Sequence, residues 1–194
     1  MTEPKSVQAI GLKEWAAALE ALRQGEQILI MRKGGIREET RDFQVEADSF
    51  YLYPTFEHQR KELIKPEYQA AVDRSTEGWS PDLTQVALTC YAELVEDILI
   101  EDGETLAKLA GEHIWTDRFA EERLKWKKAK PLHVMLLRVY ELENPATIEI
   151  REEYNGCKSW ISLPGEMLQD VPRKPVLSNE EFNRKAERIR SLLQ

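Results

Sequence analysis

Two basic residues followed by two glycines are the part of this chain best suited to binding chemistry. Arg32 and Lys33 precede Gly34 and Gly35, and all four follow the apolar run 28–31. Adjacent glycines can adopt positive φ and let backbone N–H groups converge on an anion, while Arg and Lys supply charge at the same place. The segment therefore predicts an anion clamp at a strand end. The alternative is a hairpin turn with solvated charges, because paired glycines are common in turns.

A second polar cluster contains His58, Gln59 and Arg60 and follows the apolar segment 50–53. Histidine titrates near neutral pH, so His58 could act as a general acid or base if the protein were an enzyme. No nucleophile or paired acid with a recognisable spacing accompanies it. The cluster predicts ligand contacts, and the alternative is an exposed helix start.

Two further residues are candidates because of their surroundings. Trp79 lies in a loop rich in Ser, Gly and Pro, where it could line a base pocket or pin the loop to the core. Arg138 lies in a strand with two apolar faces, so it needs a carboxylate partner or points into a cavity that holds a phosphate or a base edge. Trp126, inside the basic run 123–130, allows stacking beside phosphates, or the run simply complements the helix dipole.

Familiar cofactor motifs are missing from the sequence. Neither GxxxxGK[ST] nor GxGxxG occurs, which disfavours the usual loops for nucleoside triphosphates and dinucleotides. The three histidines are scattered, and Cys90 and Cys157 lack metal-ligand spacing. We therefore expect no metal site, no cofactor and reduced thiols.

The composition is that of an ordinary globular protein. The 194 residues include 42% hydrophobic and 32% charged residues, which fits a single domain over 1–194 with a helix at 176–194 packed on it. No segment resembles a signal peptide or a membrane span, so we expect a cytoplasmic protein without membrane contact. The net charge of −8 argues against a surface that binds nucleic acid everywhere, but it permits a local positive patch.

Hydrophobic periodicity predicts the first half of the fold. Apolar residues at helical spacing predict a helix over 12–24, ended by Gly25. Strands are predicted over 26–33 and 50–53, with a hairpin return through 43–45. Pro54 should end the sheet, and Thr55 should cap a short helix through 63.

The second half is predicted to hold the longest strands. A long buried strand is expected over 86–100, and strands 133–142 and 147–150 are separated at Pro145. Coil follows over 155–175, and Ser178 with Glu181 forms the capping box of the last helix. Irregular alternation of strands and helices predicts an α+β fold, with a mixed, mainly antiparallel sheet or small open barrel flanked by several helices.

Five sequence runs resemble one family. They are LKEWA at 12–16, RKGGIRE at 32–38, YPTFEHQ at 53–59, LLRVY at 136–140 and GCKSW at 156–160. Together they resemble a bacterial, mainly cyanobacterial family, domain of unknown function 1802. This resemblance implies at most an association with restriction-endonuclease-type domains, and hence nucleic-acid handling in a defence setting. The strand–helix–strand order around 92–95 and 137–142 is also similar to PUA-like barrels, which include readers of RNA.

Three functions remain open at this point. The first is a non-enzymatic domain that recognises nucleic acid or a nucleotide-like anion through Arg32, Lys33, the glycine turn and the His58 cluster. These two segments should then share one positively charged hollow. The second is an enzyme acting on a phosphorylated or nucleotide substrate, with His58 as acid or base. The third is a regulatory module that binds a protein partner through its acidic face.

Overall fold

The fold is organised around one curved sheet. The computed structural model describes residues 8–33, 43–126, 130–168 and 170–194. Within these ranges the seven-stranded sheet has the order β2-β5-β4-β3-β1-β6, with β7 paired to β5. The strands are β1 (Gln8–Trp15), β2 (Leu29–Arg32), β3 (Ser49–Thr55), β4 (Gln85–Ile100), β5 (Leu132–Glu149), β6 (Trp160–Pro164) and β7 (Arg173–Pro175). Each pairing is antiparallel except β1 with β3, which confirms the predicted α+β class and mainly antiparallel sheet.

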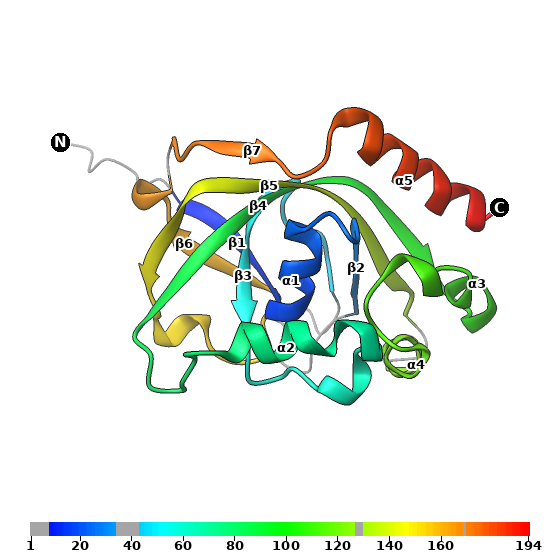
Figure 1. The fold of residues 1–194 in the computed structure, drawn as a ribbon, viewed down its shortest axis with the longest axis horizontal. Helices are drawn as coiled ribbons and strands as arrows, with labels where there is room; N and C mark the ends of the chain where they lie inside the picture. The colour runs from blue at the N-terminus through cyan, green and yellow to red at the C-terminus, as the bar shows by residue number, and fades with distance from the viewer. Residues whose placement is uncertain (1–7, 34–42, 127–129, 169) are drawn as a thin grey trace.

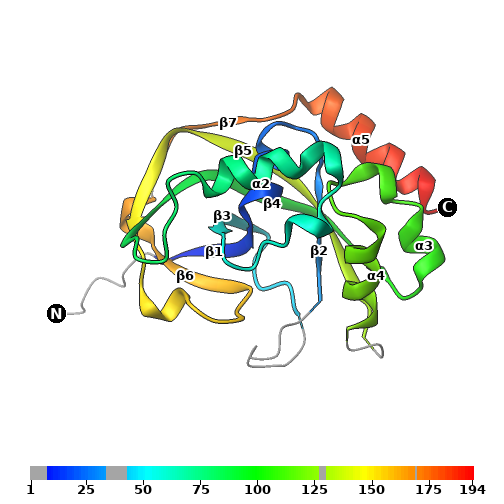
Figure 2. The ribbon, with the colours of Figure 1, turned by 60° about the horizontal axis from the view of Figure 1, so that its bottom comes forward.

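The helices cover one face and one end of this sheet. They are α1 (Ala16–Arg23), α2 (Gln69–Thr76), α3 (Gly103–Ala107), α4 (Asp117–Lys125) and α5 (Asn179–Leu192). α1 contacts β1, β3 and β5 on one side and α2 on the other (Figure 1). α3 and α4 lie together, and α4 runs beside β2 (Figure 2).

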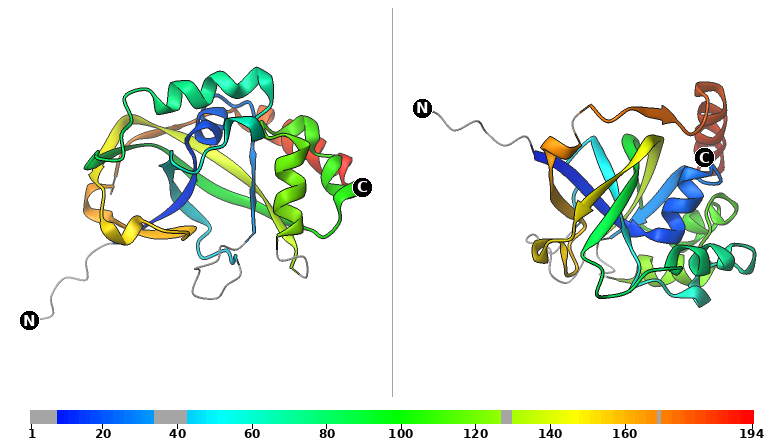
Figure 3. Two further views of the ribbon diagram at one scale, coloured as in Figure 1. Left: turned by 90° about the horizontal axis from the view of Figure 1, so that it is seen from below. Right: turned by 60° about the vertical axis from the view of Figure 1, so that its left-hand side comes forward.

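Two hydrophobic clusters form the interior. The larger cluster joins the sheet to the helices and includes Leu19, Leu136, Phe119 and Phe182. The smaller one lies among the other halves of β3 to β6. Figure 3 shows β4 and β5 as a long, curved pair that spans both regions. The two ends of the sheet are therefore packed by two different hydrophobic clusters.

The predicted helix 12–24 is wrong in its first part. Residues 8–15 form β1, which pairs with β3 on one side and β6 on the other, and the helix begins at Ala16. Leu12 is buried in either arrangement, so helical spacing of apolar residues could not exclude a strand with two neighbours. The predicted end is confirmed: Gly25 has φ +73°, and its N–H donates to the Leu22 carbonyl (3.1 Å).

The region around Pro54 also differs from expectation. Residues 43–48 form no strand, and β2 pairs with β5 instead of returning to β3. Pro54 lies inside β3 opposite Glu14, at a point where β4 no longer pairs with β3, so its missing N–H leaves no ladder gap on that side. Thr55 ends β3 and caps no helix; a short 3₁₀ turn begins later, at Lys61.

Proline was also misleading in the second half. β5 continues from Leu132 to Glu149 through Pro145, because its register with β4 jumps between Glu141 and Ala146 and leaves the proline unpaired. The expected coil 155–175 contains β6 and β7. The predicted capping box of α5 is confirmed, with Ser178 and Glu181 bonded reciprocally. Among the described residues, none of the helices has the length and hydropathy needed to cross a membrane.

Candidate functional site

A cavity of about 450 Å³ opens where five segments meet, and we name it the cationic cavity. Its walls come from the ends of β1 and β2, the segment 55–63 after β3, α4, and the segment 156–159 before β6. It is lined by six cationic side chains, two carboxylates and a histidine. They are Lys13, Arg32, Lys33, Arg60, Arg123, Lys158, Glu14, Glu122 and His58. This positive lining stands out on a chain whose net charge is −8.

The structure brings together five of the residues put forward from sequence, one of which is Trp126 at the end of α4. Arg32 and Lys33 from the end of β2 line the same cavity as His58 and Arg60 from the segment after β3. The sequence analysis expects these two segments to share one hollow, and both line this cavity although β2 and β3 are not neighbours in the sheet. Gly34 and Gly35 lie outside the described residues.

Arg32 is held by a buried carboxylate and a hydroxyl. Its Nη2 donates to Ser159 Oγ (2.5 Å), and its Nη1 lies 3.7 Å from Glu14 Oε2. Glu14 is only 3% exposed, and its Oε1 accepts from the Trp15 backbone N–H (2.8 Å). Glu14 Oε2 has no hydrogen-bond partner among the described residues. The Arg32 guanidinium is therefore fixed in position by a carboxylate whose own hydrogen-bonding capacity is incompletely used.

α4 contributes a second guanidinium to the same wall. Arg123 lies over the Phe119 ring, 5.0 Å from its centroid, and Phe119 stacks on Trp115 at 4.9 Å. Burial lowers the pKa of Arg123, with Arg32 lowering it further and Glu14 opposing the change. Because arginine remains charged in proteins, Arg32 and Arg123 present two positive groups beside one carboxylate.

The two lysines deeper in the wall have fixed partners. Lys13 donates to the carbonyl oxygens of Tyr154 (2.7 Å) and Gly156 (2.9 Å). Lys33 donates to the Leu124 carbonyl in the last turn of α4, where the helix dipole favours a cation. Burial lowers the pKa of both ammonium groups. These lysines connect the wall segments and add positive potential.

The segment that carries His58 and Arg60 is attached to α1 and α2. Gln59 Oε1 accepts from the Ala17 N–H (2.8 Å), and Gln59 Nε2 donates to Ser75 Oγ (3.1 Å). Gln59 was selected as a ligand contact, but it lies outside the cavity lining and bridges two helices. His58 and Arg60 are exposed on either side of it.

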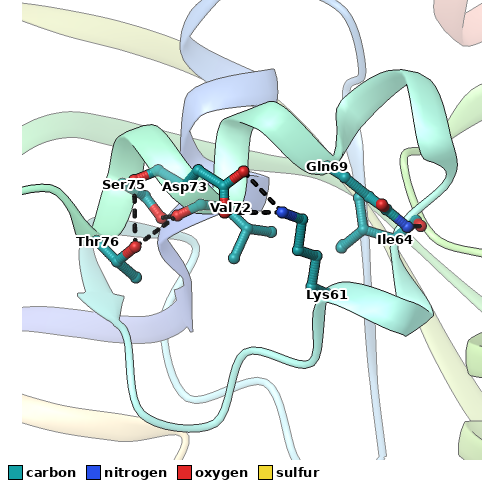
Figure 4. Close-up of polar contacts among 7 residues, drawn as sticks. All are labelled: Lys61, Ile64, Gln69, Val72, Asp73, Ser75 and Thr76. Carbon is teal, nitrogen blue, oxygen red and sulfur yellow. Dashed lines mark hydrogen bonds and ion pairs between the residues drawn. The ribbon is translucent and has the colours of Figure 1, made fainter.

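Further contacts fix the same segment to α2. Lys61 Nζ reaches the Asp73 carboxylate at 2.7 and 2.9 Å, and Gln69 Nε2 donates to the Ile64 carbonyl at 3.1 Å (Figure 4). Ser75 Oγ also donates to the Val72 carbonyl. The turn bearing His58 is therefore held in place by hydrogen bonds and an ion pair to α1 and α2.

A second hollow of about 730 Å³ adjoins the first, and we name it the aromatic cavity. Its lining includes Tyr53, Phe56, Trp79 and Tyr154. Trp79 stacks on Phe56 with centroids 5.5 Å apart and an interplanar angle of 18°. Four residues line both cavities: Lys13, Thr55, His58 and Gly156. His58 therefore lies at the wall between a cationic and an aromatic hollow.

Arg138 lies away from both of these cavities. Its Nη1 donates to Asn179 Oδ1 (2.5 Å), and its guanidinium lies 4.6 Å from the Phe182 ring centroid. Both partners belong to α5. Arg138 thus binds the last helix to β5 through an amide and an aromatic ring.

Sequence reasoning missed several cavity residues. Glu14 was hidden inside the helix predicted over 12–24, and Ser159 inside the coil predicted over 155–175. Arg123 belonged to the basic run on α4. Which side of that helix faces a cavity could not be predicted without the tertiary fold. Among the described residues, no group of three or more His, Cys, Asp or Glu side chains is arranged to hold a metal ion.

Comparison with known proteins gave one family and three distant structural likenesses. Residues 11–188 match the model of a family described as "Domain of unknown function (DUF1802)". No curated protein matches the sequence. The structure is similar to the crystal structure of ASCH from Zymomonas mobilis, with a TM-score of 0.49 and 12% identity over 82% of this chain and 90% of that chain.

Two single-residue variants of the same Zymomonas mobilis protein are also similar. One has a TM-score of 0.47 and 12% identity, covering 82% of this chain and 93% of that chain. The other has a TM-score of 0.43 and 11% identity, covering 92% and 94%. ASCH domains are PUA-like barrels.

Proposed function

This chain belongs to the DUF1802 family, and we propose that it is a non-enzymatic domain that binds nucleic acid or a nucleotide-like anion in the cationic cavity. The observation that carries the proposal is the convergence of Arg32, Arg123, Lys13 and His58 on one hollow of about 450 Å³. A phosphate needs charge and directed N–H donors together, and guanidinium groups supply both.

The charge arrangement supports an anionic ligand. Among the described residues, the Glu14 carboxylate lies 3.7 Å from Arg32 and also acts electrostatically on Arg123. Two guanidiniums beside one carboxylate leave an uncompensated positive charge in a partly desolvated place, where an anion is attracted more strongly than at the open surface. The positive lining also explains how an acidic chain could bind a polyanion locally.

Direct binding measurements test the proposal. Fluorescence anisotropy with labelled single-stranded RNA and DNA at low salt should give saturable binding that weakens steeply as salt rises. Arg32→Ala and Arg123→Ala should each lower the affinity by roughly 10- to 100-fold, as expected for charge-assisted hydrogen bonds to phosphate. The matched control is Arg184→Ala, because Arg184 is exposed on α5 and lines neither cavity.

Two results would contradict this function. If Arg32→Ala and Arg123→Ala bound the strands as well as Arg184→Ala does, the cavity would not be the binding site. If the bound strand or nucleotide were converted to product, and His58→Ala abolished that conversion, the enzyme hypothesis would replace the binding hypothesis.

A further inference from the structure

The aromatic cavity has a lining that the cationic cavity lacks. Its lining includes the half-buried Trp79 and Phe56, the buried Tyr53 and Tyr154, and the charged or titratable residues Lys13, His58, Glu57 and Glu77. Trp79 and Phe56 stack nearly parallel, with 18° between their planes, so each ring supports the other and leaves its outer face for a further flat group. Every nucleobase has a flat face that can stack on such a ring.

Tyr154, one of the lining residues, also carries a buried polar group without a hydrogen-bond partner among the described residues. Tyr154 is 1% exposed, its ring packs edge-on against Tyr53 at 5.6 Å, and its hydroxyl has no hydrogen-bond partner among the described residues. Buried hydroxyl groups are normally satisfied. Because this hydroxyl and its ring are buried, the exposed aromatic surface of the cavity belongs to Trp79 and Phe56.

The two cavities are joined at a boundary that carries positive charge. Lys13 and His58 line both, and the Lys13 ammonium is fixed by the Tyr154 and Gly156 carbonyls. A ligand that passes this boundary would have its phosphate near Arg32 and Arg123 and an attached ring near Trp79. The alternation of phosphate and flat ring is the chemical repeat of a single-stranded nucleic acid.

We infer that the two cavities form one groove for a single-stranded nucleic acid, with a phosphate in the cationic cavity and an unstacked base against Trp79 in the aromatic cavity. This inference rests on the proposed function and narrows its ligand class. The combined hollow exceeds what one phosphate group needs, and the bases of a duplex are already stacked and paired. A single strand is the form in which both contacts are available at once.

The test compares strands that differ only in their bases. The probes are a labelled oligonucleotide of about ten nucleotides and an abasic strand of the same length, which has the same phosphates and no rings. In the unmodified protein the base-bearing strand should bind more tightly. Trp79→Ala should lower its affinity by roughly 5- to 150-fold, to near the level of the abasic strand, while leaving abasic binding within about twofold.

Matched variants separate loss of stacking from loss of folding. Trp79→Phe keeps an aromatic ring and should restore most of the affinity, and thermal melts should show that both Trp79 variants fold. Arg32→Ala should weaken both strands, because both carry the phosphates. A duplex of the same sequence should bind more weakly than its single strand.

The outcomes distinguish this inference from the proposed function. Equal binding of the base-bearing and abasic strands, equal loss of both in Trp79→Ala, or a duplex that binds as tightly as the single strand would each overturn the groove and leave anion binding standing. If Arg32→Ala changed the affinity of neither strand, the proposed function would fall, and the inference with it.

Discussion

The cationic cavity and the surface where α5 packs contain the same kinds of residue but use them differently. On α5, Arg190 pairs with Glu96 at 2.8 Å, and Arg188 pairs with Glu112 at 2.5 Å. Arg138 of β5 donates a hydrogen bond to Asn179 of the same helix. In the cavity, Arg32 lies 3.7 Å from Glu14, whose second oxygen has no hydrogen bond among the described residues. Around α5, Arg188 and Arg190 each pair with a carboxylate of the fold, whereas in the cavity Arg32 and Arg123 lie beside the same carboxylate, that of Glu14.

This difference shows why residue type alone was a weak guide to the site. Arg32 and Arg138 both end or interrupt apolar strands, and sequence reasoning gave them the same role. Their partners separate them: a helix side chain for Arg138, and a cavity wall for Arg32. Three substitutions, the first of them with a matched control variant, test whether the comparison is sound.

The largest effect is expected from Glu14→Gln. Removing the buried carboxylate leaves Arg32 and Arg123 facing each other without compensation, so the free energy of unfolding should fall by about 3 to 5 kcal/mol. The same change should tighten anion binding, because it removes the negative charge beside both guanidiniums. Denaturant unfolding and anisotropy measure the two effects.

Glu122→Gln is the matched control for this experiment. Glu122 lines the same cavity but is 45% exposed, and it pairs with Arg60 (3.7 Å) and Arg118 (3.0 Å). Exposed ion pairs contribute little, so its loss should cost less than about 1 kcal/mol. Equal destabilisation by the two variants would show that the buried Glu14 carboxylate contributes no more to stability than the exposed Glu122 carboxylate.

A second effect comes from His113, beside the Glu112 that pairs with α5. Burial, and secondarily Lys65, lowers the pKa of His113 to about 4, while Asp117 opposes the change. Between about pH 6.5 and pH 4 the unfolded chain binds more protons at this residue than the folded chain does. The contribution of the neutral His113 ring to the free energy of unfolding is therefore fully present above pH 6.5. It is lost as the pH falls towards 4, by up to about 3 kcal/mol.

Unfolding curves of the parent protein and His113→Asn at several pH values measure this contribution. The variant should lose less stability than the parent between pH 6.5 and pH 4, and the two should run parallel above about pH 7. Identical pH profiles throughout would show that the His113 ring is accessible to protons in the folded state.

The smallest effect is expected from Arg138→Ala. The change removes a hydrogen bond to Asn179 and a guanidinium over Phe182, which together should cost about 1 to 2 kcal/mol of unfolding free energy. The affinity for single-stranded nucleic acid should be unchanged, whereas Arg32→Ala should lower it. A loss of affinity like that of Arg32→Ala would place Arg138 in the binding site after all.

The sequence by itself determined the local features whose causes are local. The capping box at Ser178, the helix end at Gly25 and the apolar strand predicted over 133–142 depend on neighbouring residues, and the structure contains each of them. The α+β class and the mainly antiparallel sheet also followed from the order of such segments.

Only the tertiary structure decided what depends on partners distant in sequence. β1 is a strand because β3 and β6 flank it, and β5 continues past Pro145 because a register jump leaves the proline unpaired. The cavity itself brings together Glu14, Arg32, Arg123 and Ser159. Arg32 and Ser159, which are hydrogen-bonded to each other, are 127 positions apart in the sequence. Hydrophobic periodicity reports which face of a segment is buried, but it carries no information about which segment will lie against it.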